Sequence, residues 1–437
     1  MKTVLRRTAL HLGVFAGLLA LFWALMLVAC SIPNSILQNN FESSAELYKQ
    51  SSPYQFSDSG KWNSITDNYA DAILLGVSWH MGDGEPILAT VNTRYNDGGD
   101  MGENYGLYLS VFEQADSNAD YTRYWHGSAA IVRLLQLFTD VTGIKLIGFA
   151  IAVTLALLTV AVLIKYRHAD IAAMLVISLV CVHFWNLRLS LEYQPAFILA
   201  LLLCPMYLHL ERKSDTALTL LSVAGGVSVA FFDFLTTETV TLLLPLILVT
   251  AVRAKEGRLA SFKQDLSLML KCCIAWGGAY AAAFLIKWGL AAVVTGDSIA
   301  DLALGSAVNR IGGEIPEAEG KMNSVFDALF ANITTLLGGT ERVQMNYVII
   351  GTVLFAAILA SLWYMLRAKE QKAEGSAILA ILSLMVPLRY ILLANHSYLH
   401  EFFTYRALVS TVLACLLIVV INVKLPLGGK LTAGGRK

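Results

Sequence analysis

The run GIKLIGFAIAVTLALLTVAVLI, residues 143–164, decides the class of fold, and the basic group KYRH, residues 165–168, follows it directly. An α-helix needs roughly 20 apolar residues to cross the hydrocarbon core of a bilayer. The run has that length, is dominated by Leu, Ala and Val, and lacks the strict alternation of a barrel strand. It therefore predicts a membrane-spanning helix that ends beside a basic connection.

Similar apolar runs recur along the chain. We expect membrane-spanning helices at 8–30, 143–164, 170–184, 195–210, 216–231, 238–252, 268–292, 344–366, 376–393 and 404–421. Some of these runs are short, which implies tilt or burial within a bundle. Composition agrees, because 15% of the residues are charged and a soluble domain carries about 25%. The expected fold class is an all-α polytopic membrane protein with about ten transmembrane helices.

Basic residues mark every second connection. Lys2, Arg6 and Arg7 precede the first run, and the later basic groups are Lys165, Arg167 and His168; Arg212 and Lys213; Arg253, Lys255, Arg258 and Lys263; Arg367, Lys369 and Lys372; and Lys424, Lys430, Arg436 and Lys437. Cytoplasmic loops carry an excess of Lys and Arg. We therefore expect a multi-pass protein of the cytoplasmic membrane with both termini in the cytoplasm, which agrees with an even number of spans.

The remaining connections would then lie outside the cytoplasm. We expect residues 1–30 to form the first transmembrane helix and 31–140 a mixed extracytoplasmic domain, because nine Trp and Tyr residues between 62 and 125 exceed what a disordered tether carries. That domain ends in SAAIVRLLQLF, residues 128–138, which we interpret as a helix on the membrane surface with Arg133 and Gln136 among apolar residues. Residues 141–424 would form the transmembrane bundle with an outer loop at 295–342, and 425–437 a cytoplasmic tail.

The end of the first run leaves one alternative open. The residues LVAC, 27–30, followed by Ser31, fit a lipoprotein cleavage box with Cys30 as the lipidated residue. The apolar stretch before them is longer than the 7–15 residues of a typical signal sequence, which favours a retained span.

Charge and cysteine content exclude several function classes. Lys plus Arg and Asp plus Glu both number 32, so net charge gives no reason to expect a nucleic-acid partner. The six cysteines lie in or beside apolar segments, which excludes a disulfide framework in the long polar loops. No Cys/His spacing typical of a zinc site occurs.

The first candidate for chemistry is DNYAD, residues 67–71. Asp67 and Asp71 are four residues apart and would share one face of a helix. Two close carboxylates repel, so the pKa of one rises, which suits a general base or a metal site. The alternative is a capped helix start.

Two further groups lie in the same loop. Asp83 and Glu85 precede the Gly-rich stretch 96–103, where carboxylates could hold a divalent cation, although the calcium-loop spacing is absent and exposed turns are the alternative. Arg123, Tyr124, Trp125 and His126 stand together before the expected surface helix. They offer a phosphate fork, aromatic faces and a titratable ring; the alternative is an aromatic belt at the interface.

Ionisable residues also gather near the outer ends of the expected spans. They are Arg188, Glu192, Asp233, Arg389, His396, His400, Glu401 and Arg406. Charges at membrane depth are costly and suggest function by default. Arg389 and Arg406 suit a phosphate, and His396 and His400 have the spacing of a metal-ligand pair, although no HExxH occurs. The alternative is pairing inside the bundle, for instance Arg389 with Asp233. The segment DFLTTE, 233–238, is expected as a tight turn or a re-entrant element.

These features together resemble the GT-C class of integral membrane glycosyltransferases, mainly in architecture. The resemblance implies a cytoplasmic N-terminus, one span, a large first extracytoplasmic loop with membrane-surface helices, and a further bundle. It also implies sugar transfer from a polyprenyl-phosphate donor at the outer membrane face, with a carboxylate base in the first loop and cationic groups for the lipid phosphate.

Carried onto this sequence, the resemblance gives Asp67 or Asp71 as the base, and Asp83 or Glu85 as the less favoured candidates. Arg123, Arg389 and Arg406 would contact the phosphate. The expected function is a bacterial inverting glycosyltransferase of the cell envelope, whose partners are the lipid-linked sugar, a glycan, lipid or protein acceptor and membrane lipids. Because the donor is already an activated phosphate ester, a divalent cation is possible but optional, and the sequence indicates no other cofactor.

Two rival functions remain. A transporter or flippase for a lipid-linked or anionic substrate predicts internal pseudosymmetry and broken helices at the bilayer midplane. A non-catalytic membrane subunit would use the first loop for docking. The transferase predicts carboxylates of the first loop and arginines at the outer face, whereas transport predicts a central cavity open to both sides.

Overall fold

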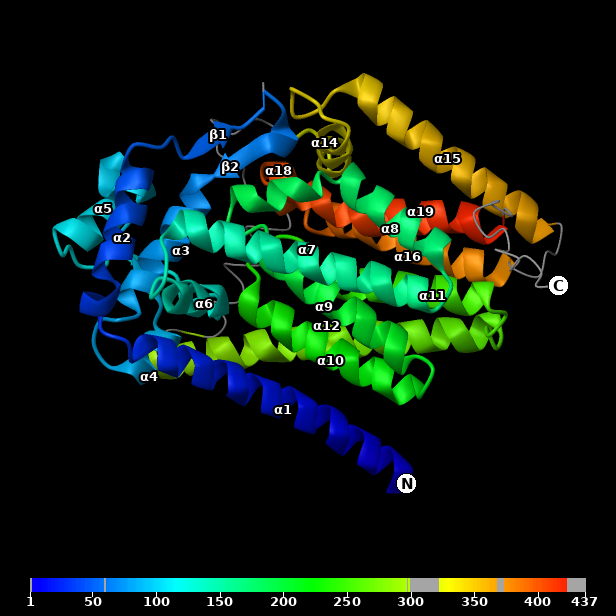
Figure 1. Cartoon of the computed structure of the whole chain (residues 1–437), viewed down its shortest axis with the longest axis horizontal. Coiled ribbons are helices and arrows are strands. Elements are labelled where there is room, and N and C mark those ends of the chain that lie inside the picture. The colour runs from blue at the N-terminus through cyan, green and yellow to red at the C-terminus, as the bar shows by residue number, and fades with distance from the viewer. Residues whose placement is uncertain (1, 59, 297, 299–321, 368–372, 423–437) are drawn as a thin grey trace, which may run out of the picture.

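The computed structural model describes residues 2–58, 60–296, 298, 322–367 and 373–422. The expected tail at 425–437 and residues 297 and 299–321 of the expected outer loop at 295–342 lie outside the described residues. The long helices lie side by side along the longest axis of the molecule, and the short elements of residues 31–140 gather at one end (Figure 1).

Each expected span coincides with a helix. The ten helices are α1 (Lys2–Cys30), α7 (Val141–Lys165), α8 (Ala169–Cys181), α9 (Pro195–Leu210), α10 (Asp215–Phe232), α11 (Val240–Lys255), α12 (Phe262–Thr295), α15 (Met345–Arg367), α16 (Ala373–Leu392) and α19 (Val409–Asn422). Among the described residues, six helical stretches are long and apolar enough to cross a membrane: Leu5–Cys30, Val141–Lys165, Asp215–Phe232, Phe262–Thr295, Glu374–Leu392 and Glu401–Asn422. The chain is therefore mostly helical with the character of a membrane protein, and the count of about ten spans stays a prediction.

Helix α11 forms the centre of the bundle. All of its residues from Val240 to Ala254 are buried, and it packs against α9, α16 and α19. A helix that is apolar on every side suits such a position, because it has no face for solvent or lipid. The largest hydrophobic cluster runs through this helix and its neighbours.

Local sequence explains where several long helices begin and end. The side chains of Asp140, Ser214 and Ser261 accept hydrogen bonds from the first turns of α7, α10 and α12. Such caps satisfy backbone N–H groups that have no partner inside the helix. Helix α12 ends where Gly296 takes a left-handed conformation with φ of 80°.

Residues 31–140, the first-loop segment, contain short elements. They are α2 (Asn34–Lys49), β1 (Tyr54–Phe56), η1 (Trp62–Ser64), β2 (Ile65–Asp67), α3 (Asn68–His80), α4 (Pro86–Val91), β3 (Arg94–Tyr95), η2 (Gly99–Met101), α5 (Glu103–Phe112), β4 (Ala119–Asp120) and α6 (Gly127–Leu135). Strands β1 and β2 pair antiparallel with Tyr54 opposite Asp67, and β3 pairs with β4 in the same way.

The first-loop segment shares its hydrophobic core with the bundle. One cluster joins residues of α2, α3, α5 and α6 to α1, α10 and α12. The Trp125 ring stacks on Phe231 at 5.0 Å between centroids, and its Nε1 donates to the Ala283 carbonyl at 2.9 Å. A side chain at Gly127 would lie 2.4 Å from Phe231, so only glycine allows this approach of α6 to α10. The segment is therefore fixed to the helices that it follows.

Helix α6 stands where the sequence predicts a membrane-surface helix, but its polar side chains are buried. Arg133 and Gln136 are both 0% exposed. The Arg133 guanidinium donates to the carbonyls of Ala29 and Ser78 at 2.9 and 2.8 Å. Backbone carbonyls at the ends of α1 and α3 thus satisfy the charge that we expected at a surface. Cys30, the candidate lipidation residue, is the last residue of α1 and is buried.

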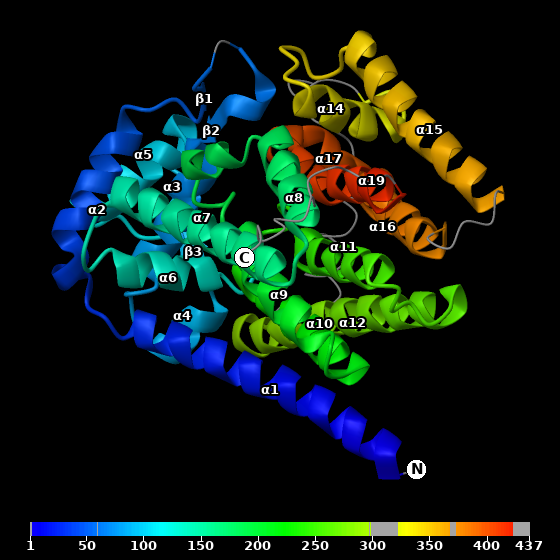
Figure 2. The same ribbon diagram turned by 45° about the vertical axis from the view of Figure 1, so that its right-hand side comes forward.

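The connection between α12 and α15 contains structure that the sequence analysis did not predict. Helix α14 (Phe326–Leu336) packs against α17 (Ala394–Leu399), and α15 lies beside α14 and α16 (Figure 2). Between α16 and α19 the chain forms α17, α18 (Glu401–Thr404) and η5 (Tyr405–Leu408). Asn332 ties these pieces together, because it donates to the Ser397 carbonyl and accepts from the Thr404 hydroxyl, both at 2.8 Å.

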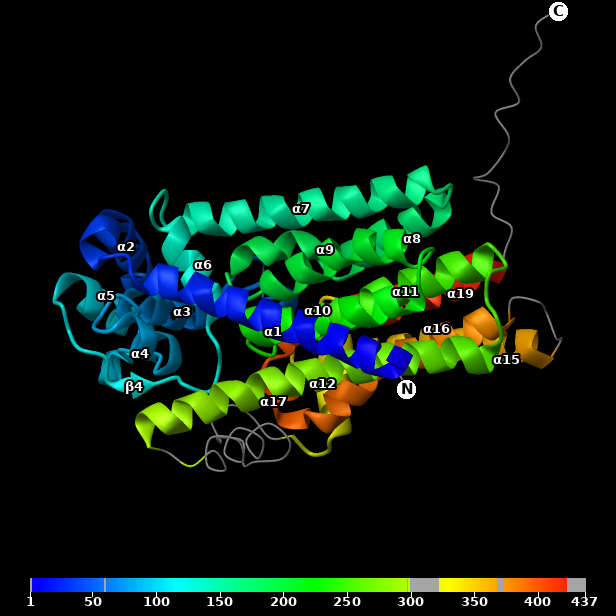
Figure 3. The same cartoon turned by 90° about the horizontal axis from the view of Figure 1, so that it is seen from below.

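Ion pairs connect helix ends at the other end of the bundle. Glu211, whose side chain is 0% exposed, pairs with Arg253 at 3.1 Å and with Arg258 at 2.7 Å. Glu256 pairs with Arg212 and His168 in the same region. Helix α1 begins and α19 ends toward this end, away from the first-loop segment (Figure 3).

Candidate functional site

Asp71 lies in the first turns of α3 and is completely buried. Its Oδ1 accepts from the Ser190 hydroxyl at 2.7 Å and the Leu191 N–H at 2.8 Å. Its Oδ2 accepts from the Tyr48 hydroxyl at 2.9 Å and lies 2.6 Å from Lys145 Nζ. Four donors from three other segments thus occupy both oxygens, which is the arrangement of a structural carboxylate.

Asp67 lies one turn earlier, at the joint between β2 and α3. It is the N-cap of α3 and accepts from the Ala70 N–H at 2.9 Å. Burial raises the pKa of the Asp67 carboxyl to about 7, and the negative charge of Asp71 adds to the rise, whereas the Ala70 N–H and Lys145 oppose it. A carboxyl that titrates near neutral pH can accept a proton from a substrate, so Asp67 is the better base of the two. Asp67 was expected within a helix together with Asp71, but the helix begins at Asn68, because residues 65–67 pair with β1.

Tyr193 connects Asp67 to Arg406. Its hydroxyl donates to the Ile65 carbonyl at 3.0 Å, two residues before Asp67. The Arg406 guanidinium lies over the Tyr193 ring, 4.1 Å from the centroid. Aromatic faces attract guanidinium groups in this geometry. Strand β2 and η5, which are more than 300 residues apart in the sequence, therefore meet at one tyrosine.

Arg406 is buried with unused donors. Its side chain is 1% exposed, and Nη1 donates to the Phe402 carbonyl at 3.1 Å. Within the described residues, Nε and Nη2 have no hydrogen-bond partner. A buried guanidinium with two nitrogens that donate to nothing is costly unless an anion or water satisfies it. This edge of the guanidinium has the donor geometry that a phosphate accepts.

Glu192 and Asp233 complete a group with Asp67, here called the carboxylate cluster. Burial and the negative charges of Asp67 and Asp233 raise the pKa of Glu192, which places the three groups within electrostatic reach of one another. Burial also raises the pKa of Asp233 to about 7, although the Thr236 hydroxyl and N–H bind its carboxylate. In the described part of the chain, the Glu192 carboxylate accepts no hydrogen bond. The cluster therefore holds protons near neutral pH.

Arg389 forms a pair inside the bundle. Its Nε and Nη2 bind the two oxygens of Glu238, each at 2.9 Å, and Nη1 donates to the Ser397 hydroxyl at 3.1 Å. Nη2 also donates to the Leu235 carbonyl at 2.9 Å. The pairing alternative thus holds with Glu238 as the hydrogen-bonded partner instead of Asp233. Each guanidinium nitrogen of Arg389 therefore already donates to a group of the chain, so no free forked edge remains for a phosphate in this arrangement.

The connection DFLTTE is a buried turn between α10 and α11. Leu235 adopts φ of 70°, and its carbonyl accepts from Arg389 and from His396 Nε2, the latter at 2.8 Å. Two donors on one carbonyl explain how irregular backbone is tolerated at this place. The rings of His396 and His400 lie 4.9 Å apart, and His400 stacks on Phe403. No group of three metal-ligating side chains occurs among the described residues.

The group Arg123 to Gly127, with the sequence RYWHG, divides into two parts. Trp125 and His126 are buried, and His126 has a left-handed backbone with φ of 59° at the start of α6. Its Nε2 bonds to the Tyr121 carbonyl at 2.6 Å, and burial lowers the pKa of His126 to about 3, so the ring is neutral. Arg123 is exposed and lies over the rings of Tyr121 and Tyr124. Burial raises the pKa of Tyr121 and the Glu192 charge adds to the rise, so the ring under Arg123 lies within electrostatic reach of the carboxylate cluster.

Three other candidates lie elsewhere. Asp83 and Glu85 follow the far end of α3, about 20 Å from Asp67 along a helix of 13 residues. Asp83 accepts from His80 Nδ1 at 2.7 Å, and Glu85 is exposed. Arg188 is exposed in η3 (Phe184–Leu189) and forms no ion pair within the described residues. The structure thus gathers Asp67, Asp71, Asp233, Arg389, His396 and Arg406 and leaves these three apart.

Sequence reasoning gave no role to three residues that shape the site. Tyr193 and Glu192 follow the third expected span, and Glu238 ends DFLTTE. Glu192 and Glu238 carry a readable signal, since a charge at the end of an apolar run needs a partner. Tyr193 gives no such signal, because its role depends on contacts with segments far along the chain.

The arrangement offers a carboxyl that accepts protons near neutral pH and a buried cation with unpartnered nitrogens, both within electrostatic reach of one tyrosine. Such a pair suits a reaction that deprotonates one substrate and releases an anion from another. Comparison with family models, curated protein sequences and solved structures finds no match for this chain.

Proposed function

We propose that this chain is a membrane glycosyltransferase that transfers a sugar from a polyprenyl-phosphate donor to a hydroxyl acceptor at the extracytoplasmic face. The observation that carries the proposal is that Tyr193 lies within electrostatic reach of both Asp67 and Arg406: its hydroxyl donates to the Ile65 carbonyl, two residues before Asp67, and its ring lies under the Arg406 guanidinium. Asp67 supplies a base and Arg406 supplies unpaired donors for an anion. The resemblance of the architecture to the GT-C class supports the same reading.

In the proposed reaction the acceptor oxygen attacks the anomeric carbon of the donor. The bond from that carbon to the phosphate oxygen breaks, and its electron pair leaves with the polyprenyl phosphate. The acceptor proton passes to Asp67. Arg406 donates to the leaving phosphate through Nε and Nη2, the two atoms without partners among the described residues, and stabilises the charge that develops there.

Sidedness completes the proposal. The ten helices cross the membrane, the ends tied by Glu211 and Arg253 face the cytoplasm, and the first-loop segment faces outward. Basic residues in the connections at the end of the bundle that contains Glu211 and Arg253 support this orientation. Helix α1 begins and helix α19 ends toward the same end of the bundle, which agrees with an even number of crossings.

The test compares Asp67→Asn with Asp116→Asn, an exposed acidic residue of the same loop. Each variant replaces the full-length protein in the source organism, and mass spectrometry records the composition of surface polymers. We expect deletion of the protein to remove a sugar, Asp116→Asn to restore it and Asp67→Asn to fail at equal protein level. A general base contributes about 10²–10⁴-fold to a rate. Full restoration by Asp67→Asn overturns its assignment, and unchanged polymers in the deletion strain overturn the function.

A further inference from the structure

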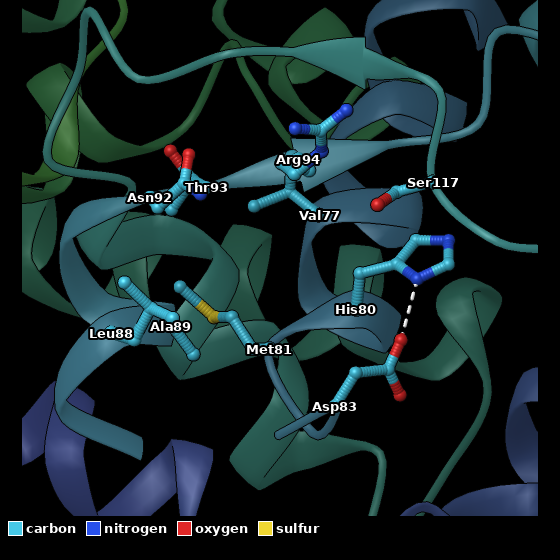
Figure 4. A pocket seen from close by; sticks show the side chains of 10 residues that line it. All are labelled: Val77, His80, Met81, Asp83, Leu88, Ala89, Asn92, Thr93, Arg94 and Ser117. Carbon is cyan, nitrogen blue, oxygen red and sulfur yellow. Dashed lines mark hydrogen bonds and ion pairs between the residues drawn. The ribbon is translucent and has the colours of Figure 1, made fainter. Parts of the chain in front are cut away.

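A second site lies in the first-loop segment, where residues from α3, α4 and the following strands enclose a cavity of about 160 Å³ (Figure 4). Pockets for drug-sized ligands measure about 300–1,000 Å³, so this one is the size of a single small ring. It lies at the far end of α3 from Asp67 and is separate from the carboxylate cluster. The reaction proposed above does not use it.

The charged groups that line the cavity already have partners in the chain. Asp83 Oδ2 lies 2.7 Å from His80 Nδ1, and Arg94 Nη1 lies 2.9 Å from Asp120 Oδ1. A charged ligand would have to compete with one of these pairs, whereas a neutral polar ligand need not. The charge balance of the lining therefore favours an uncharged molecule.

One polar atom of the lining lacks a partner. The Oδ1 of Asn92 is buried and accepts no hydrogen bond from the described residues. A buried acceptor of this kind is costly until a donor reaches it. Asn92 and Ser117 stand on opposite sides of the cavity in Figure 4. A ligand with hydroxyl groups on two edges satisfies both.

Apart from Thr93, whose hydroxyl donates to the Tyr121 carbonyl, the remaining lining is aliphatic. Val77, Met81, Leu88 and Ala89 form that wall. A ring with hydroxyl groups around its edge and C–H groups on its face matches a wall of this kind beside isolated polar groups. We propose that this cavity binds one neutral sugar ring, either a free monosaccharide or the end residue of a glycan.

A hydrolytic role for the same residues does not fit. His80 Nε2 lies 3.0 Å from the Ser110 hydroxyl, so Asp83, His80 and Ser110 form a line of hydrogen bonds. Ser110 is 0% exposed, and its hydroxyl donates to the Gly106 carbonyl at 2.9 Å. A nucleophile must reach its substrate, and Ser110 does not line the cavity. The line instead fixes the His80 ring as one wall of the cavity.

Saturation-transfer NMR on the full-length protein in detergent tests the proposal. The probes are D-glucose, D-galactose, N-acetyl-D-glucosamine, maltotetraose and chitotetraose. We expect saturable transfer to at least one probe; binding of a monosaccharide identifies a free sugar as sufficient, and binding of a tetrasaccharide alone identifies a glycan end. The absence of saturable transfer to all five overturns the proposal.

Variants locate the binding. Asn92→Leu removes the orphaned acceptor at similar volume and should weaken binding at least tenfold, whereas Asn39→Leu, on the exposed side of α2, should not. Leu88→Trp fills the mouth of the cavity at a side chain that is 46% exposed, so it should fold and lose binding. Undiminished binding in both Asn92→Leu and Leu88→Trp overturns the site. Asp67→Asn should bind the probe normally, which separates this result from the test of the transferase.

Discussion

Lys145 Nζ lies 2.6 Å from Asp71 Oδ2 and joins the first turns of α7 to α3. The Lys145 side chain is 15% exposed and the Asp71 side chain is 0% exposed. Asp71 also receives Tyr48, Ser190 and the Leu191 N–H. One carboxylate thus holds α2, α3, α7 and the segment before α9 in register beside Asp67.

Asp71→Asn should destabilise the protein strongly, because it leaves the Lys145 charge without its partner in a mostly buried place. Breaking a buried pair costs about 3–5 kcal/mol. Thermal unfolding of the purified protein in detergent measures the effect. Asp58→Asn breaks the exposed pair with Lys61 and should cost about 1 kcal/mol or less. Equal melting temperatures for the two variants would contradict a structural role for Asp71.

Asp67 should link activity and stability to pH with opposite signs. The proposed base must be ionised, so sugar transfer should rise as pH increases through about 7, the raised pKa of Asp67. The folded pKa lies above the ordinary value of 3.8, so the folded state binds the proton more tightly. Its contribution to stability is present at low pH and is lost as pH rises toward 7.

Asp67→Asn should therefore flatten the loss of stability between pH 5 and 8. In the wild type this one group lowers the free energy of unfolding by up to about 1.4 kcal/mol per pH unit, and the melting temperature falls with it. Melting curves of wild type, Asp67→Asn and Asp116→Asn across that range provide the measurement. A slope in Asp67→Asn as steep as that of the wild type would show that Asp67 does not titrate there.

Arg389→Gln should reduce folding instead of substrate binding. Glu238 would keep a buried charge without its bidentate partner, at a cost of about 3–5 kcal/mol. The double variant Arg389→Gln with Glu238→Gln should recover part of the loss, because it leaves no lone charge. Protein yield and melting temperature test both. If Arg389→Gln keeps normal stability while losing activity, the pair is part of the phosphate site.

Arg406→Gln should instead spare the fold and lose the phosphate contact. The glutamine retains bulk over Tyr193, whereas the two unpartnered donors of the arginine disappear. We expect the affinity of Arg406→Gln for polyprenyl phosphate, measured by competition, to fall at least tenfold. Its melting temperature should stay close to that of the wild type. Arg123→Gln, at an exposed position, tests the second arginine of the expected clamp and should weaken binding less.

Cysteine labelling tests the orientation. Asn39→Cys on α2 and Lys213→Cys after α9 are both exposed. A membrane-impermeant maleimide applied to intact cells should label Asn39→Cys above the level of the parent protein. Lys213→Cys should react only after the membrane is permeabilised. The reverse pattern would place the first-loop segment in the cytoplasm and remove the basis of the proposed reaction.

The positions of the long helices were predictable because apolar length is a local property. The expected run at 143–164 differs by two residues or fewer at each end from α7, and 195–210 has the bounds of α9. The proximity of Asp67 and Asp71 was predictable for the same reason, since one is the N-cap and the other lies in the first turn of the same helix. Local patterns fail where the apolar run is interrupted, as at α17 and η5.

Partners could not be predicted, because they come from distant segments. Nothing near Asp71 in the sequence indicates Lys145, and nothing near Arg406 indicates Tyr193. The RYWHG group shows the same limit, since aromatic residues at a membrane interface and aromatic residues in a core have the same composition. Only packing against Phe231 and Ala283 decides that Trp125 belongs to the core.

Glu211 gives two basic residues at its end of the bundle a second role. Arg253 and Arg258, which the proposed topology needs during biosynthesis to retain their loop on one side, are afterwards neutralised by a buried carboxylate. In that proposed topology, a charge that steers insertion of the nascent chain later holds helix ends together in the folded protein. Exchanging these arginines for lysines would preserve the first task and impair the second, since lysine cannot form the forked contact.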